Sequence, residues 1–195
     1  MSFTILPRSL ALAAAALLAS ACSDAGFATA PPANPSLVPP AASWVTSTTS
    51  TTGVSALKRK NAILETTVSS VIGADGGSIT VSGAGFTLIV PPNAVRVPTM
   101  FSVRALAGTD IAYEFEPHGA RFAVMPIFKQ DLSKANMSGV SLALVEGAYF
   151  ANAAQLNMMA DDARVDEFFK PITLDSKLFF ALPHFSGYMV SSARR

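Results

Sequence analysis

The sequence predicts an all-β protein with a single antiparallel β-sandwich domain, which follows a signal segment and a disordered linker. Short apolar runs recur from about residue 60 onward, with turn residues between them. No segment holds a long apolar period of 3.6 residues, so helices of ordinary length are not expected. Several short strands at regular spacing favour two packed sheets, each with one face toward a shared core.

Residues 1–21 predict a signal peptide. Arg8 supplies positive charge, residues 10–20 are apolar, and small residues precede Cys22. The apolar run is shorter than the roughly 20 residues that a helix needs to cross a bilayer. The position of Cys22 resembles that of the lipidated cysteine in bacterial lipoproteins, although Ala19 stands where those signals prefer leucine. The resemblance implies fatty acylation of the Cys22 thiol; an ordinary secretory signal with a free Cys22 is the alternative.

The segment 22–59 is predicted to be a linker that begins at the lipidated cysteine. It is rich in proline, alanine, serine and threonine up to about residue 53. Such residues bury little apolar surface and do not repay the entropy of ordering. We therefore expect a tether, with the folded domain occupying residues 60–195.

The expected strands follow from local patterns. Segments 78–82 (SITVS) and 86–90 (FTLIV) flank Gly83-Ala84-Gly85 and predict a hairpin. Pro91-Pro92 lacks two ladder donors and ends the second strand. Further strands are expected at 100–107, 111–116, 122–129, 141–145, 167–174, 178–182 and 187–191.

Charge and cysteine content exclude several classes of partner. The chain has 14 basic and 13 acidic residues, and loss of Arg8 with the signal peptide leaves the two equal. The longest run of basic residues is Lys58, Arg59 and Lys60, so no nucleic-acid partner is expected. Cys22 is the only cysteine, which excludes an intrachain disulfide and a CxxC pair.

Three motifs resemble the ZU-five domain, the β-sandwich module of ankyrins and netrin receptors. The resemblance spans residues 71–190 and implies a binding or assembly module. Asn93 replaces the usual glycine, which is acceptable because asparagine enters the positive-φ region more readily than most residues. The matching segments are Gly76-Gly77 with residues 86–94 (FTLIVPPNA), residues 116–122 (EPHGARF) with Pro126, and residues 184–190 (HFSGYMV).

The last motif also implies a chemical possibility. Some relatives of this family cut their own chain between the Phe and the Ser of an HFS triplet, here His184-Phe185-Ser186. Ser186 would attack the preceding carbonyl of Phe185, and His184 would act as the general base. A structural role for His184 beside a strand is the alternative.

Other candidate sites are weak, and neither a cofactor nor a metal is expected. The separation of His118 and His184 specifies no metal site. The acidic residues between 161 and 167 lack the spacing and glycine of a calcium loop. The hydrolase elbow, phosphate loop and dinucleotide fingerprint are all missing from the sequence.

Three functions follow as expectations. The first is a non-enzymatic module, anchored in the bacterial cell envelope by lipid on Cys22 and binding a protein or polymer partner. If the cell has an outer membrane, that is the expected site of anchoring. The second is an autoproteolytic sandwich that uses His184, Phe185 and Ser186. The third is a secreted or periplasmic soluble protein of unknown activity.

Overall fold

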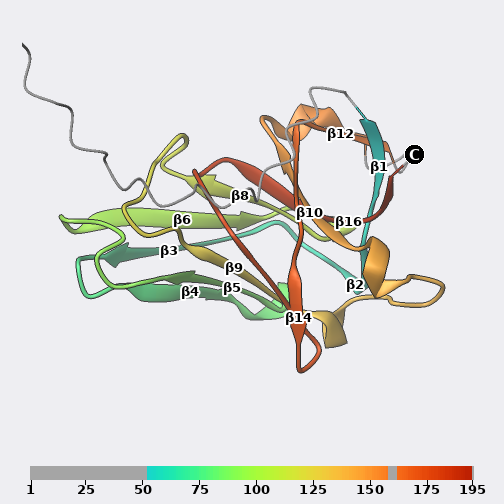
Figure 1. Cartoon of the computed structure of the whole chain (residues 1–195), viewed down its shortest axis with the longest axis horizontal. Helices are drawn as coiled ribbons and strands as arrows, with labels where there is room; N and C mark the ends of the chain where they lie inside the picture. The colour runs from blue at the N-terminus through green and yellow to red at the C-terminus, as the bar shows by residue number, and fades with distance from the viewer. Residues whose placement is uncertain (1–51, 158–161, 195) are drawn as a thin grey trace, which may run out of the picture. The chain divides into compact units, whose positions relative to one another are not determined.

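A computed structural model describes residues 52–157 and 162–194, which form an all-β sandwich (Figure 1). Every strand pair in these ranges is antiparallel, as the sequence predicts. The helical segments within them are short 3-10 turns. These turns are η1 (Ser82–Ala84), η2 (Leu132–Lys134), η3 (Leu142–Leu144) and η4 (Ala153–Gln155).

The larger sheet has the strand order β11-β12-β1-β16-β8-β6-β3, and β10 pairs with both β13 and β16. β16 is its central strand, because β10 covers one edge of it while β8 and β1 pair in succession along the other. Its strands are β1 (Thr52–Ala56), β3 (Thr66–Ile72), β6 (Thr99–Ala105), β8 (Ala112–Glu116), β10 (Glu146–Phe150), β11 (Leu156–Asn157), β12 (Asp162–Val165), β13 (Glu167–Phe169) and β16 (Gly187–Arg194).

The second sheet has the order β14-β15-β9-β5-β4, and a separate two-stranded ribbon pairs β2 with β7. The hairpin expected around Gly83-Ala84-Gly85 is confirmed as β4 and β5, with η1 as its connection. The strands are β4 (Gly77–Val81), β5 (Phe86–Val90), β9 (Ile127–Asp131), β14 (Ile172–Leu174) and β15 (Lys177–Ala181), with β2 (Lys58–Ile63) and β7 (Gly108–Asp110) in the ribbon.

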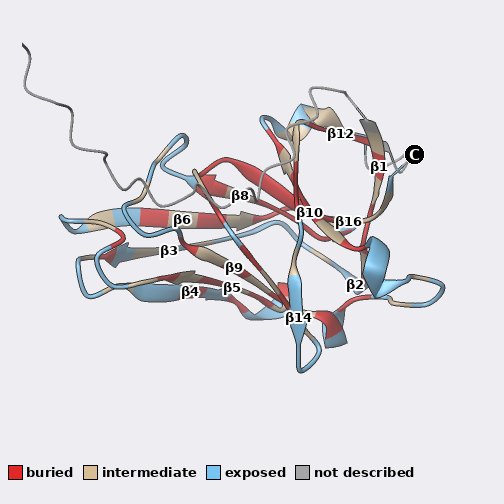
Figure 2. Ribbon diagram, viewed as in Figure 1, coloured by how far each residue is buried: buried red, intermediate tan, exposed pale blue. Residues whose placement is uncertain are grey.

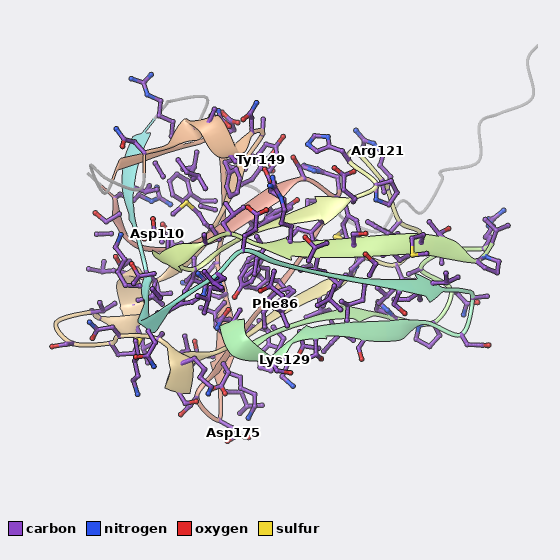
Figure 3. All side chains as sticks on the ribbon, turned by 180° about the vertical axis from the view of Figure 1, so that it is seen from behind. Phe86, Asp110, Arg121, Lys129, Tyr149 and Asp175 are labelled. Carbon is purple, nitrogen blue, oxygen red and sulfur yellow. The ribbon has the colours of Figure 1, made fainter. Side chains whose placement is uncertain are left out.

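Aromatic side chains fill the space between the two sheets. Phe86 of β5 stacks on Tyr113 of β8 at 4.2 Å between ring centroids and meets Phe128 of β9 edge-on at 4.7 Å. Figure 3 labels Phe86 between the layers, and Figure 2 shows buried residues concentrated on β6, β8 and β16. The buried Tyr113 hydroxyl donates to Gln130 Oε1 at 2.7 Å, and burial raises the pKa of Tyr113 to about 12. The core is therefore apolar, and the polar groups of Tyr113 and Gln130 within it are hydrogen-bonded to each other.

A second, smaller apolar cluster lies on the β1, β10, β12 and β13 side of the larger sheet. It includes Val54, Phe150, Phe168 and Met189. Phe169, next to Phe168, belongs instead to the main core. Adjacent aromatic residues on β13 are thus buried on both faces of the strand.

Proline explains two departures from the expected strands. Segment 167–174 divides at Pro171 into β13 and β14, which belong to different sheets. Segment 122–129 is a strand only from Ile127, after Pro126. Proline has no N–H for a ladder bond, so a strand readily ends beside it. Segment 141–145 is the short turn η3, whose leucines are exposed, rather than a strand.

The described fold includes residues 52–59, whereas the sequence predicts that the domain starts at residue 60. β1 pairs with β12 and β16, and Val54 and Leu57 are buried. The sequence does not predict this strand, because it follows a serine- and threonine-rich segment and contains few apolar side chains. The signal segment and Cys22 lie outside the described residues. Within the described part of the chain, no helix has the length and apolar character to span a membrane.

Candidate functional site

The turn before β16 lies against the loop that follows β8. Phe115 N–H donates to the Ser186 carbonyl at 2.9 Å, and Phe185 N–H donates to the Ala120 carbonyl at 3.0 Å. Arg121 and His184 form an isolated antiparallel bridge. These backbone contacts bring the EPHGARF and HFSGYMV segments, which are remote in sequence, into one site.

Ser186 and His118 are in direct contact. Ser186 Oγ lies 2.7 Å from His118 Nε2. Ser186 is buried, whereas His118 is exposed. In the tautomer that carries its proton on Nδ1, the Nε2 atom of His118 accepts a hydrogen bond from the Ser186 hydroxyl. This is the arrangement of a nucleophile and its general base.

The Phe185 carbonyl, next to Ser186, has a backbone donor of its own. Gly119 N–H donates to this oxygen at 2.7 Å. Gly119 has a φ of +76°, a conformation that glycine adopts without steric cost. The turn that contains His118 and Gly119 is also held by the Glu116 carboxylate, which accepts a hydrogen bond from His118 N–H at 2.5 Å. A donor held on this oxygen could stabilise the negative charge that develops there in acyl transfer.

Phe185 is buried among aromatic rings. Its ring lies 4.6 Å from Phe122, 5.3 Å from Phe101 and 5.4 Å from Phe115. The acyl side of the Phe185–Ser186 peptide is therefore anchored in the main core. A fixed acyl group and a fixed hydroxyl have little freedom to lose before they react.

His184 has a different set of contacts from the one expected. Tyr188 Oη donates to the His184 carbonyl at 2.8 Å and lies 3.4 Å from its Nδ1. The imidazole packs edge-on against Tyr149 at 4.8 Å, and Figure 3 labels Tyr149 and Arg121, which flank His184. Burial lowers the pKa of His184. His118 thus occupies the place beside Ser186 that the sequence suggested for His184.

Sequence reasoning could have found His118 only through the EPHGARF motif. That motif marks the turn, but no local pattern says which later residue the turn contacts. The pairing of β8 with β16 supplies this information.

The remaining candidate residues form no metal site in the described ranges. No group of three His, Cys, Asp or Glu side chains there is arranged to hold a metal ion. Asp161 lies outside the described residues.

A scan against protein-family models finds no match to this chain, and a search of curated proteins finds no significant relative. The resemblance to the ZU-five domain therefore stays a prediction from the three motifs.

Proposed function

We propose that this domain cleaves its own chain between Phe185 and Ser186. The observation that carries the proposal is the 2.7 Å contact between Ser186 Oγ and His118 Nε2. The hydrogen bond from Gly119 N–H to the Phe185 carbonyl supports it, because nucleophile, base and oxyanion donor then surround one peptide.

The reaction is an N-to-O acyl shift followed by hydrolysis. His118 takes the proton of the Ser186 hydroxyl as Oγ bonds to the Phe185 carbonyl carbon. The C–N bond then breaks, and the proton passes to the Ser186 amine, leaving an ester. Water hydrolyses the ester, giving a carboxylate on Phe185 and restoring the Ser186 hydroxyl.

The two products stay associated in this proposal. Residues 187–194 form β16, which is held by β1, β8 and β10. Cleavage would remove one covalent bond while leaving the sheet intact.

Intact-mass spectrometry of the purified, denatured chain tests the proposal. We expect a peptide that begins at Ser186, and we expect Ser186→Ala to abolish it. His118→Gln should slow its appearance by roughly 10²–10⁴-fold, the usual contribution of a general base. His184→Gln is the matched control and should cleave at a rate close to that of the parent chain.

Two results would contradict the proposal. The first is a single uncut mass for the parent chain after prolonged incubation. The second is equal cleavage in the parent and in His118→Gln, which would remove His118 from the chemistry.

We further propose that lipid on Cys22 anchors the domain in the bacterial cell envelope. The signal-like residues 1–21 and the composition of the linker support this proposal. Cys22→Ser should abolish fatty-acid labelling and leave an unprocessed precursor. Normal maturation of this variant would instead favour a secreted or periplasmic protein.

A binding function is the second candidate. β14 is an edge strand, and its Ile172 and Leu174 are 68% and 62% exposed (Figure 1). Exposed apolar edge strands are typical interaction surfaces, which suits an envelope protein or polymer partner. A partner cross-linked in intact cells should be lost in the Ile172→Lys, Leu174→Lys double variant. It should be retained in Leu142→Lys, which changes an exposed leucine on η3.

A further inference from the structure

A small basic pocket lies between β2, η1 and η2, away from the residues of the self-cleavage site. Its volume is about 210 Å³. The side chains and backbone that line it are those of Arg59, Lys60, Asn61, Gly83, Ser133 and Lys134. Three of these residues carry positive charge, and none carries negative charge.

The two lysines of the pocket have no ion pair in the described part of the chain. The nearest acidic neighbour in sequence is Asp131, which precedes η2. Its carboxylate accepts the Ser133 N–H at 2.9 Å as the cap of that turn. The Ser133 hydrogen bonds lower the pKa of Asp131 most and Lys134 is one of the charges that lower it further, but within the described residues neither Lys134 nor Lys60 has a directly bound carboxylate.

Arg59 adds a buried cation to the same pocket. It is only 3% exposed, and its guanidinium lies 5.3 Å from the centre of the Tyr113 ring. The guanidinium donates hydrogen bonds to backbone carbonyl oxygens, those of Leu106, Gly108, Asp110 and Ala112. The Asp110 carboxylate pairs with Lys58.

One N–H donor of this guanidinium has no hydrogen-bond acceptor among the described residues. Arg59 Nε is buried and has no hydrogen-bond partner in the described structure. A buried cation without a bound carboxylate is costly, and an anion nearby would reduce that cost. The residues that line the pocket thus include a buried cation as well as two exposed ones.

We propose that this pocket binds a phosphoryl group, as a phosphomonoester that is either free in solution or the headgroup of a lipid. The residues that line it include two lysines, a serine and an asparagine, whose side chains can all donate hydrogen bonds. A tetrahedral dianion accepts from all of them and gains more from the three cations than a singly charged, planar carboxylate does.

Gly83 allows a sharp test. A Cβ built on Gly83 has no heavy atom within 4 Å, so a side chain there meets open space beside the pocket. Gly83→Glu adds a carboxylate that competes with the ligand, and Gly83→Gln adds the same volume without charge. Lys134→Gln removes a donor from the pocket, while Lys170→Gln removes an exposed lysine that does not line it.

Isothermal titration calorimetry on the full chain in detergent, at fixed ionic strength, uses three probes: inorganic phosphate, glycerol 3-phosphate and dihexanoyl phosphatidic acid. We expect saturable binding that weakens about tenfold or more in Gly83→Glu and Lys134→Gln, since each changes a charge in contact with a dianion. Gly83→Gln and Lys170→Gln should bind like the parent.

The probes also distinguish the two sources of ligand. Similar affinities for glycerol 3-phosphate and the short-chain lipid indicate a soluble phosphomonoester. A much higher affinity for the lipid indicates a headgroup. The proposal is overturned if no probe binds saturably, or if Gly83→Glu and Gly83→Gln bind equally well.

Discussion

His118 and His184 lie close to one peptide but in different surroundings. His118 is exposed and contacts the Ser186 hydroxyl, whereas His184 is half-buried against Tyr149 and Tyr188. In the proposed self-cleavage, this contrast favours His118 as the base and leaves His184 a packing role.

The packing role of His184 predicts a pH dependence of stability. Burial lowers its pKa, Arg121 and His118 lower it further, and Glu167 opposes them. The unfolded chain therefore takes up the proton first as the pH falls through the ordinary histidine pKa of about 6.5. The free energy of unfolding should be fully present above this value and should fall as the pH drops toward the folded pKa.

Urea unfolding between pH 5 and pH 7 measures this effect. His184→Gln should flatten the pH dependence, while Lys170→Gln should leave it unchanged. An equal slope in His184→Gln and the parent would show that another group is responsible.

Some single-residue features follow from sequence and others do not. Asn93 has a φ of 62°, as expected for an asparagine in place of a turn glycine. The partner of Ser186 could not be predicted, because it depends on contact between segments 68 residues apart. The conformational preference of one residue can be predicted from its type, whereas a contact between distant segments requires the tertiary structure.

At the scale of elements, β16 tolerates little change at its first residue. A Cβ on Gly187 would lie 2.1 Å from the ring of Phe150 on the paired strand β10. Both residues are buried, so the ring cannot move aside into solvent. Close packing of this pair explains why glycine follows Ser186.

Gly187→Ala should therefore destabilise the domain by about 1–3 kcal/mol or more, the usual cost of overpacking a core. Gly83→Ala is the matched control, because no heavy atom lies within 4 Å of its Cβ. We expect that variant to change stability by less than about 1 kcal/mol. Urea unfolding midpoints compare the two, and equal midpoints would contradict the packing argument.

Strands with strong local signals are the ones that the sequence predicts. The β4–β5 hairpin, β6, β8, β15 and β16 carry alternating apolar residues and clear turns. β1 and β2 were missed because serine, lysine and arginine dilute the pattern at 52–63. The strand order could not be predicted, because β1 finds its partners in β12 and β16, at the far end of the domain.

At the scale of the whole molecule, the two sheets depend on the last described strand. β16 connects β1, β8 and β10, and its Tyr188 and Val190 belong to the main core. Loss of β16 would expose these neighbours and leave their ladder groups unpaired.

This dependence predicts different outcomes for a cut chain and a shortened one. A chain that ends at Phe185 should show no cooperative unfolding transition, whereas a chain nicked after folding should unfold cooperatively. Near-ultraviolet circular dichroism during urea titration distinguishes them. A cooperative transition in the shortened chain would contradict a central role for β16.

The central position of β16 also determines when the newly made chain can fold. A ribosome delivers residues in order, so β1, β8 and β10 emerge before the strand that joins them. The sheet cannot close until residues 187–194 arrive, and the chain must stay unfolded until then. Any peptide bond that reacts only in the finished fold is thereby protected throughout synthesis.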